Sequence, residues 1–487
     1  MSMIQVTNLT FGYEGNAENI FENATFCLDT SWRTGFIGRN GRGKTTFLTL
    51  LQGKYEYLGN ITHSTTFKYF PFEIIDEGKS CEEIAREIAP EHESWQLIWE
   101  ITKLELEESV LSRPFNTLSM GERNKLMLAC LFLEDEGFLL IDEPTNHLDM
   151  HAREVVGEYL RGKSGFLLVS HDRHFLDLAV DHILSINRAS IEVQKGNFSS
   201  WQQNKTLKDE REKAENEQLK RDISRLNIAA KRAEKRSNTI EDSKIGNHVG
   251  DRGYLGHKAA KMMKRGKALE LRAERVVEEK SKLLTDLEEA QKLKLYPLER
   301  SGFLLELKDI TIKYGKHTAC ENVSFTLTSG QRLAIIGKNG SGKSSLLKLI
   351  MGEDISYTGT FYKPGNLKMS YVSQDTSFLR GNLLKYAEER EIDTSLFLAV
   401  LRQLDFSRSQ FEIGMERYSE GQKKKVLLAS SLCDSAHIYV WDEPLNFIDV
   451  MSRVQIEELI LAHNPTLLFV EHDKHFSSIL GNDWLQL

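Results

Sequence analysis

The pattern of apolar and polar positions divides the chain into three stretches. In residues 1–200 and 301–487, short apolar runs such as GFLLID, GFLLVS, IYVWDE and TLLFVEH alternate with helical patterns. This alternation predicts a mostly parallel sheet flanked by helices. Residues 201–300 are instead rich in Lys, Glu, Leu, Ala and Arg, and Pro297 is their one proline. We therefore expect two α/β domains, 1–200 and 301–487, joined by a helical segment, 201–300.

The middle segment has the pattern of two long helices, at about 198–238 and 258–295. Leu269, Val276, Leu283 and Ala290 form a stripe with a spacing of seven, as helices that pack along their length do. Between the helices, SKIGNHVGDRGYLGH contains four glycines, which disfavour a helix. The segment is predicted to be an antiparallel helical hairpin with a glycine-rich tip near 240–257.

The two outer domains repeat each other. GRNGRGKT at 38–45 recurs as GKNGSGKS at 337–344, and LSMGE, FLLIDEPTNHLD and LLVSHDRHF recur as YSEGQ, IYVWDEPLNFID and LLFVEHDKHF. FGY, which ends at Tyr13, recurs as IKY, which ends at Tyr314. The landmarks keep their order and spacing, so the chain holds two homologous domains.

Composition and charge narrow the class of protein. The 487 residues carry a net charge of −8, but residues 202–300 hold 25 Lys+Arg against 18 Asp+Glu, a local surplus of +7. No apolar run is long enough to span a membrane, and the N-terminus lacks the pattern of a signal peptide. The five cysteines are scattered, which disfavours a disulfide framework or zinc site. We expect a cytoplasmic protein.

Each domain carries the chemistry of nucleotide hydrolysis. In G-x-x-x-x-G-K-[ST], glycines allow backbone N–H groups to face phosphate oxygens. Lys44 and Lys343 are placed to reach the β- and γ-phosphates, and Thr45 and Ser344 to hold Mg²⁺. Asp142 and Asp442 end apolar strands, where a carboxylate can complete the Mg²⁺ shell.

Further pairs of residues follow the same repeat. Glu143 and Glu443 could polarise the attacking water, and His171 and His472 could donate to it or to the γ-phosphate. Tyr13 and Tyr314 could stack on adenine or pack in the core. The segments Ser119–Gly121 and Ser419–Gly421 could bind a γ-phosphate or simply cap a helix.

Together these motifs resemble the ATP-binding-cassette set, and two cassettes joined by a charged helical linker resemble the ABC-F family. The resemblance implies a head-to-tail cassette dimer within one monomeric chain. Each phosphate loop then faces the other cassette's Ser-x-Gly segment. It also implies Mg²⁺ ligation by Thr45, Asp142, Ser344, Asp442 and Gln374. Implied ATP contacts are Tyr13, Gly38, Asn40, Gly41, Gly43, Lys44, Thr45, Thr46, Ser119, Gly121, Tyr314, Gly337, Asn339, Gly340, Gly342, Lys343, Ser344, Ser345, Gln374, Ser419 and Gly421.

The resemblance extends to a subgroup. GRNGRGKTT, WDEPLNFIDV and EHDKHF are similar to segments of the Lsa-type antibiotic-resistance proteins. Near-equal spacings from phosphate loop to signature leave no room for the arm insertion of housekeeping members. The subgroup implies protection of the large ribosomal subunit from lincosamides, streptogramin A and pleuromutilins. It implies as partners the 70S ribosome at the E site, 23S rRNA and P-site tRNA, with neither membrane nor DNA bound.

The two cassettes depart from the family pattern in different ways. Gln374 occupies the family's Q-loop position in the second cassette, whereas Phe72 occupies it in the first. Met120 and Glu420 each replace a signature glycine. Because Phe cannot contact Mg²⁺ or water as an amide does, we expect the two sites to hydrolyse ATP differently.

The basic surplus lies beside the predicted tip of the hairpin. Concentrated positive charge on a negative chain favours contacts with an RNA backbone, although a charged helix can also be a merely solvated one. Tyr and His side chains at the tip could stack on unpaired bases. The candidate RNA contacts are Lys231, Arg232, Lys235, Arg236, His248, Arg252, Tyr254, Leu255, His257, Lys258, Lys261, Lys264 and Arg265.

Three alternatives stay open at this point. A housekeeping translation factor of the same family shares the fold, ATP and the ribosome. The ATPase subunit of a membrane exporter has no need of a basic hairpin. A DNA-associated ATPase would use that hairpin to grip duplex DNA.

Overall fold

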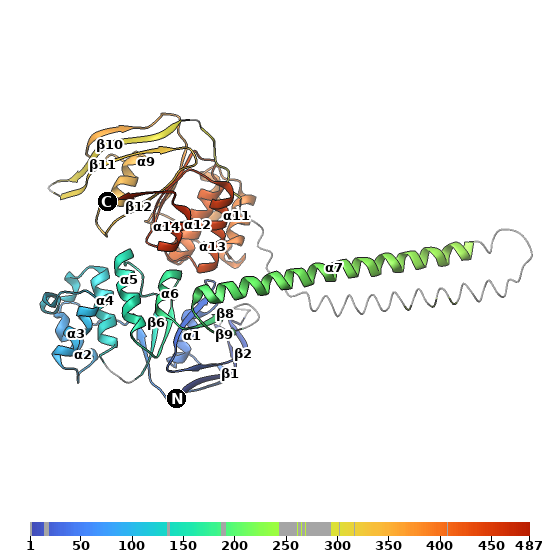
Figure 1. Ribbon diagram of the computed structural model, residues 1–487, viewed down its shortest axis with the longest axis horizontal. Coiled ribbons are helices and arrows are strands. Elements are labelled where there is room, and N and C mark those ends of the chain that lie inside the picture. The colour runs from blue at the N-terminus through green and yellow to red at the C-terminus, as the bar shows by residue number, and fades with distance from the viewer. Residues whose placement is uncertain are drawn as a thin grey trace, which may run out of the picture. The chain divides into compact units, whose positions relative to one another are not determined.

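The computed structural model describes most of the chain, and its described part divides into two compact units (Figure 1). One unit holds both cassettes, residues 1–199 and 291–487, and the other is residues 200–290. The described residues are 2–13, 19–133, 137–186, 191–242, 261, 264, 268, 294–300, 302–315, 317–406 and 408–487. Among them, no helix is long and apolar enough to cross a membrane.

The first cassette combines an antiparallel sheet with a mostly parallel one. The antiparallel sheet has the order β2-β1-β4, and the second has the order β5-β6-β7-β3-β8-β9, in which only β9 runs antiparallel to its neighbour. The strands are β1 (Met3–Phe11), β2 (Phe21–Asp29), β3 (Arg33–Gly38), β4 (Leu58–Thr62), β5 (Phe67–Phe70), β6 (Phe138–Asp142), β7 (Phe166–Val169), β8 (His182–Ile186) and β9 (Ile191–Lys195).

Helices cover the parallel sheet of the first cassette. The central strands β6 and β7 read FLLID and FLLV and are almost wholly buried, as expected of parallel strands covered on both faces. The helices are α1 (Lys44–Leu51), α2 (Cys81–Ile88), α3 (Ser94–Lys103), α4 (Met120–Leu131), α5 (Met150–Arg161) and α6 (Arg173–Ala179), with 3₁₀ turns at Glu108–Ser112 and Phe115–Thr117.

The second cassette repeats this architecture. Its antiparallel sheet has the order β11-β10-β13, and its parallel sheet the order β14-β15-β16-β12-β17. The strands are β10 (Phe303–Tyr314), β11 (His317–Thr328), β12 (Arg332–Ile336), β13 (Tyr357–Tyr362), β14 (Met369–Val372), β15 (Ile438–Asp442), β16 (Leu467–Val470) and β17 (Asp483–Gln486). The helices are α9 (Lys343–Met351), α10 (Leu383–Glu389), α11 (Thr394–Gln403), α12 (Glu420–Cys433), α13 (Val450–His463) and α14 (Lys474–Leu480), with 3₁₀ turns at Arg408–Glu412 and Met415–Arg417. The expected pair of α/β cassettes is confirmed.

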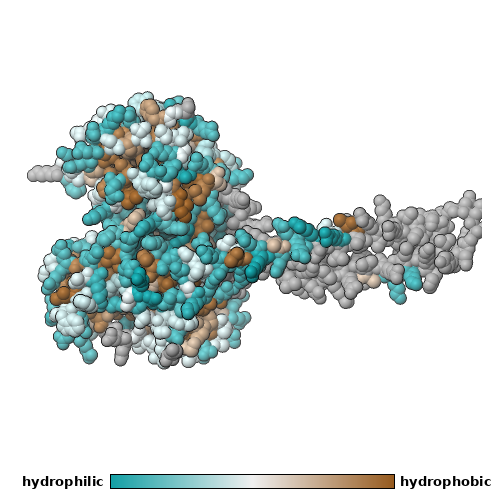
Figure 2. Space-filling model, viewed as in Figure 1, coloured by the Kyte–Doolittle hydropathy of each residue, from teal (hydrophilic) through white to brown (hydrophobic). Residues whose placement is uncertain are grey.

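The helix α7 (Phe198–Asp242) follows the first cassette in the chain. Its 45 residues correspond to a length of about 68 Å at ~1.5 Å per residue. Its described side chains are mostly hydrophilic (Figure 2), although Leu207 and Ile228 are exposed. The helix continues four residues beyond the expected end at residue 238.

The end of the linker, where the chain enters the second cassette, differs from the expectation. The second linker helix was expected to run to residue 295, but residues 294–300 are not helical. Leu295 is instead buried in the core of the second cassette, and the Leu298 amide donates to the Ala436 carbonyl oxygen at 2.8 Å. Near the start of this predicted helix the structure describes residues 261, 264 and 268, which are helical and exposed.

Candidate functional site: two paired nucleotide sites

The first phosphate loop joins the end of β3 to the start of α1. Gly43 precedes the helix with φ of 90°, and a Cβ there would lie 2.4 Å from the Ile20 side chain. Only glycine tolerates this combination of backbone angle and close approach. Lys44 is buried, and its ammonium donates to the carbonyl oxygens of Gly38 (2.7 Å) and Arg39 (3.2 Å). The loop therefore curls around its own lysine and leaves the helix N-terminus available to an anion.

The carboxylates of the first site lie where parallel strands end. β6 ends at Asp142, and His171 follows β7 by two residues, so both lie at the same edge as the phosphate loop. Asp142 Oδ2 accepts hydrogen bonds from the Thr45 hydroxyl (2.9 Å) and the Tyr69 hydroxyl (3.1 Å). Burial raises the pKa of Asp142. A hydroxyl and a carboxylate in contact are oxygen ligands that fit Mg²⁺.

Glu143 has few partners in the first site. Its side chain is half-buried, but Oε1 is fully buried, lies 3.3 Å from His171 Nε2 and accepts no hydrogen bond from the described residues. Burial, and then the neighbouring Asp142, raise the pKa of Glu143 to about 8. Burial together with nearby cations lowers the pKa of His171, so its imidazole is neutral.

The second site has the same parts with a fuller set of contacts. β12 leads through Gly337–Ser344 into α9, and Lys343 donates to the carbonyl oxygens of Gly337 (2.9 Å) and Lys338 (2.8 Å). Burial raises the pKa of Asp442 to about 6, although the Ser344 hydroxyl opposes the rise. Asp442 Oδ1 is buried and accepts no hydrogen bond among the described residues. A buried carboxylate oxygen without a donor fits a cation such as Mg²⁺.

Glu443 differs from Glu143 in its partners. It accepts from the Gln374 amide at 2.9 Å and from the Asn446 amide at 2.6 Å, and His472 Nε2 lies 3.3 Å away. Burial opposes ionisation, but contacts with His472, Lys424 and Gln374 outweigh it and lower the pKa of Glu443. The two candidate catalytic carboxylates therefore have different surroundings, as the sequence difference at Phe72 and Gln374 suggested.

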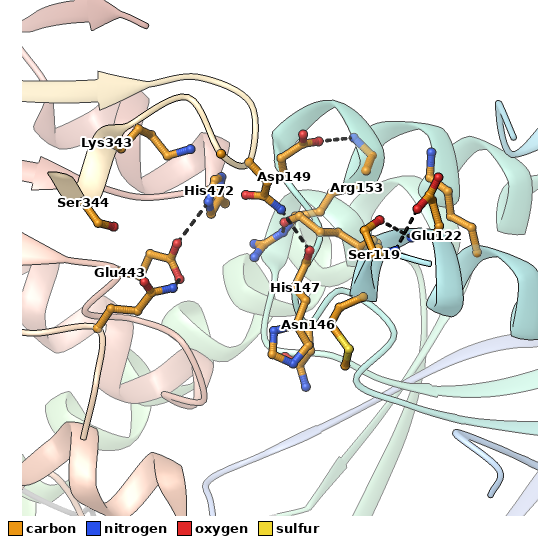
Figure 3. Close-up of a pocket in the computed structure, with 18 of the residues that line it drawn as sticks. Ser119, Glu122, Asn146, His147, Asp149, Arg153, Lys343, Ser344, Glu443 and His472 are labelled. Carbon is orange, nitrogen blue, oxygen red and sulfur yellow. Dashed lines mark hydrogen bonds and ion pairs between the residues drawn. The ribbon is translucent and has the colours of Figure 1, made fainter. Parts of the chain in front are cut away.

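A cavity of about 1040 Å³ lies at the second site and is lined by both cassettes. Figure 3 shows Lys343, Ser344, Glu443 and His472 facing Ser119 and the segment Asn146–Asp149 across this cavity. Of the predicted ATP contacts, the cavity brings together Ser119, Gly121, Tyr314, Asn339, Gly340, Gly342, Lys343, Ser344, Ser345 and Gln374.

The predicted aromatic contacts differ between the sites. Tyr314 is 48 % exposed and lines the cavity. Tyr13 donates or accepts a 3.0 Å hydrogen bond with the Thr46 hydroxyl, and its ring packs edge-on against Phe11 and Tyr55. Tyr13 therefore packs against its own cassette and stays partly exposed, whereas Tyr314 lines the cavity.

The signature serines cap helices. Ser119 accepts from the Glu122 amide at the start of α4, and Ser419 accepts from the Gln422 amide at the start of α12. A Cβ on Gly421 would lie 3.6 Å from Asn40 Nδ2 of the other cassette. The first phosphate loop thus faces the second signature segment, as the head-to-tail arrangement requires.

The loops around His147 and Phe447, in which no site residue was predicted, also connect the cassettes. The Asn40 amide donates to the Phe447 carbonyl oxygen at 2.8 Å, and the Asn339 amide donates to the His147 carbonyl oxygen at 3.1 Å. Both loops lie in the repeated segments NHLD and NFID. The repetition of these segments was visible in the sequence. Their hydrogen bonds to the phosphate loop of the other cassette were not.

A buried ion pair also joins the cassettes. Arg173 donates to both carboxylate oxygens of Glu457 at 3.0 and 2.8 Å, and both side chains are buried. Lys474 contacts Glu154 at 2.5 Å across the same interface. A bidentate arginine–carboxylate pair fixes orientation as well as proximity.

The predicted RNA contacts are only partly described. Lys231, Arg232, Lys235 and Arg236 lie on α7, and Lys261 and Lys264 are exposed helical residues. The predicted tip contacts His248, Arg252, Tyr254, Leu255, His257, Lys258 and Arg265 lie outside the described residues.

Comparisons with known proteins agree with this geometry. A family model described as ABC transporter matches residues 21–146 and 320–446, more than half of the chain. The ribosome protection protein VmlR of Bacillus subtilis (strain 168) is 28% identical, over 97% of this chain and 84% of VmlR. The ATP-binding protein Uup of Buchnera aphidicola subsp. Acyrthosiphon pisum is 26% identical, over 98% of this chain and 79% of Uup.

A solved structure shares the arrangement of two cassettes. The archaeal ribosome recycling factor aABCE1, solved with the ribosomal stalk protein aP1, superposes with a TM-score of 0.64 at 19% identity, over 98% of this chain and 87% of that chain. At this identity the likeness concerns the fold. With two phosphate loops, two strand-end carboxylate pairs and a matching family model, the chain belongs to the ABC transporter family and is an ATP hydrolase with two ATPase cassettes.

Proposed function

We propose that the chain is a cytoplasmic ABC-F ATPase that binds the ribosome and protects its large subunit from lincosamides, streptogramin A and pleuromutilins. The similarity to VmlR, a protein named for ribosome protection, carries this proposal because it extends over 97% of the chain. The Lsa-like segments support the drug classes. The 45-residue helix α7, with four basic residues near its end, supplies an element long enough to reach a distant RNA surface.

The proposed cycle begins with closure of the cassettes on ATP. Each phosphate loop presents backbone N–H groups and a lysine, and the other cassette presents its signature segment to the same nucleotide. Thr45 with Asp142, and Ser344 with Asp442, would hold Mg²⁺, which neutralises phosphate charge during transfer. Because a nucleotide so held contacts both cassettes, it favours the closed state by its differential affinity. Closure fixes the linker for binding at the ribosomal E site.

Hydrolysis then releases the cassettes. We assign water activation to Glu143 and Glu443, with His171 and His472 contacting the water or the γ-phosphate. The second site has the fuller set of contacts, because Gln374, Asn446 and His472 all hold Glu443. We infer that the second site hydrolyses ATP faster than the first site.

The charge of the linker supports RNA binding. Residues 202–300 have a surplus of +7 in a chain of net charge −8, and positive charge concentrated on one element favours phosphate contacts. We propose 23S rRNA and the P-site tRNA as its partners. The drug is then displaced either by contact with the tip or by a change in the rRNA.

A housekeeping translation factor of the same family is the alternative, because the chain is about equally similar to Uup, which is named for ATP binding and not for ribosome protection. Drug susceptibility separates the two. The chain and its Glu143→Gln/Glu443→Gln variant are expressed in a sensitive bacterium and tested against lincomycin, tiamulin and a streptogramin A, with intracellular drug measured.

Raised tolerance at unchanged drug accumulation, with the double variant trapped on ribosomes, supports protection. Trapping without any drug effect supports the housekeeping role. Lowered accumulation without ribosome association means export and contradicts both.

A further inference from the structure

The two phosphate loops differ at two positions that, in the first loop, face the other cassette. The first loop has Arg39 and Arg42 where the second has Lys338 and Ser341. Arg39 Nη1 and Arg42 Nη2 each lie 3.7 Å from Asp405 Oδ1 of the second cassette. The three side chains are only about one-fifth exposed, at 19%, 23% and 20%. One carboxylate therefore holds two arginines of the same loop from across the interface.

The position of Asp405 is set by the backbone. It follows the end of α11 with φ of 67°, and its amide donates to the Arg402 carbonyl oxygen at 3.0 Å. Asp is one of the few residues that tolerate this left-handed conformation. Its short side chain is therefore presented to the interface from a fixed point, at little cost in side-chain entropy.

The second site provides an internal comparison. Glu105 follows α3 with φ of 55°, in the place that Asp405 has after α11. Its carboxylate is instead 2.7 Å from His151 Nε2 of its own cassette. Within the described residues, no ion pair joins Glu105 to Lys338, and Ser341 carries no charge. The double contact belongs to the first site.

We propose that Asp405 is a positioning residue, which acts from the second cassette on the phosphate loop of the first site. By holding Arg39 and Arg42, it keeps the Gly38–Thr45 loop against the second cassette and slows the release of nucleotide. The hydrogen bond from Asn40 to the Phe447 carbonyl oxygen has a counterpart from Asn339 to the His147 carbonyl oxygen at the second site, so the difference between the sites rests on Asp405. The first site thus retains nucleotide while the second exchanges it. The proposal rests on ATP hydrolysis alone and not on ribosome binding.

The test is nucleotide release from the purified full-length chain. The chain is loaded with a fluorescent ADP analogue (mant-ADP) and chased with excess ADP. We expect two phases. Lys44→Ala should remove the slow phase and Lys343→Ala the fast one, which assigns each phase to a site.

Asp405→Asn should then accelerate the slow phase about threefold to tenfold, as expected for two partly exposed ion pairs, and leave the fast phase unchanged. Asp405→Glu should restore most of the slow rate. Glu105→Gln is the matched control and should leave the slow phase as it is. Arg42→Ser installs the residue of the second loop and should reproduce the acceleration, so a folding defect in one variant does not decide the result.

Three results would overturn the proposal. A single release phase in the unmodified chain would show that the two sites release nucleotide at the same rate. Equal rates in Asp405→Asn and the unmodified chain remove the role of the carboxylate. Slower release in Asp405→Asn would show that the arginines bind phosphate directly and that Asp405 draws them away from it. Because no ribosome is present, none of these results bears on the proposed drug protection.

Discussion

Replacing Gln374 with Phe would give the second site the residue that the first site has at the equivalent position. The substitution removes the amide donor 2.9 Å from Glu443 and leaves the contacts from Asn446 at 2.6 Å and His472 at 3.3 Å. A hydrogen bond to a charged group contributes about 1.5–3 kcal/mol. Because two partners remain, we expect a loss near the lower end, which corresponds to about a tenfold fall in kcat.

The assay counts turnover at the second site. Phosphate release is measured at saturating Mg-ATP in a Glu143→Gln background, which removes the carboxylate of the first site. Binding of fluorescent mant-ATP is titrated in parallel. The resemblance places Gln374 among the ATP and Mg²⁺ contacts, but in the structure its amide donates to Glu443. Because the phosphate loop around Lys343 is untouched, we expect affinity to change by less than about threefold, which corresponds to ~0.7 kcal/mol. Phe72→Leu in the same background is the matched control and should leave both quantities unchanged.

Two results would refute this reasoning. A kcat within twofold of the parent would show that the Gln374 contact does not position Glu443 for reaction. A fall in kcat matched by an equal fall in mant-ATP affinity would show that Gln374 contributes to binding and not to the position of the carboxylate.

Three further predictions concern the interface, the loop and the linker. Arg173→Gln leaves the Glu457 carboxylate buried without its partner and should lower the free energy of unfolding in urea by about 3 kcal/mol. The control Arg161→Gln, which breaks an exposed ion pair, should change that free energy by less than about 0.5 kcal/mol. Equal effects of the two substitutions would contradict the role of the buried pair. Gly342→Ala combines φ of 86° with a Cβ 2.5 Å from the Ala319 carbonyl oxygen and should weaken mant-ATP binding at the second site about tenfold or more, at ~1–3 kcal/mol of strain; wild-type affinity would contradict the geometry. Ribosome binding should depend less steeply on salt when four basic residues of α7 become Gln, and an unchanged slope would contradict an RNA contact by Lys231, Arg232, Lys235 and Arg236.

The parts of each site that the sequence predicted are those made by consecutive residues. A phosphate loop needs its glycines, lysine and hydroxyl within eight positions, so the motif carries the geometry with it. The strand-end residues Asp142 and Glu143 were also predictable, because parallel strands bring their carboxyl ends to one edge. The linker ended differently from the prediction because Leu295 packs in a cassette core, and an apolar residue at helical spacing does not reveal which surface covers it.

The contacts between cassettes could not be read from the sequence. Asn40 and Phe447 are 407 positions apart and meet only when the two cassettes dock, as do Arg42 and Asp405. Phe72 signalled a difference between the sites, yet the sequence has Asn at both 146 and 446. Only the structure shows that Asn446 donates to Glu443. Differences in side-chain direction at identical residues depend on packing and not on residue type.

The central claim is that the ATP-bound chain removes antibiotics from the ribosome. The direct measurement is retention of radiolabelled lincomycin on purified 70S ribosomes after addition of the Glu143→Gln/Glu443→Gln variant with ATP. The account predicts that the variant cosediments with the ribosomes and that bound lincomycin falls with its occupancy, whereas ADP prevents both. A variant that occupies the ribosomes fully while lincomycin stays bound would contradict the account.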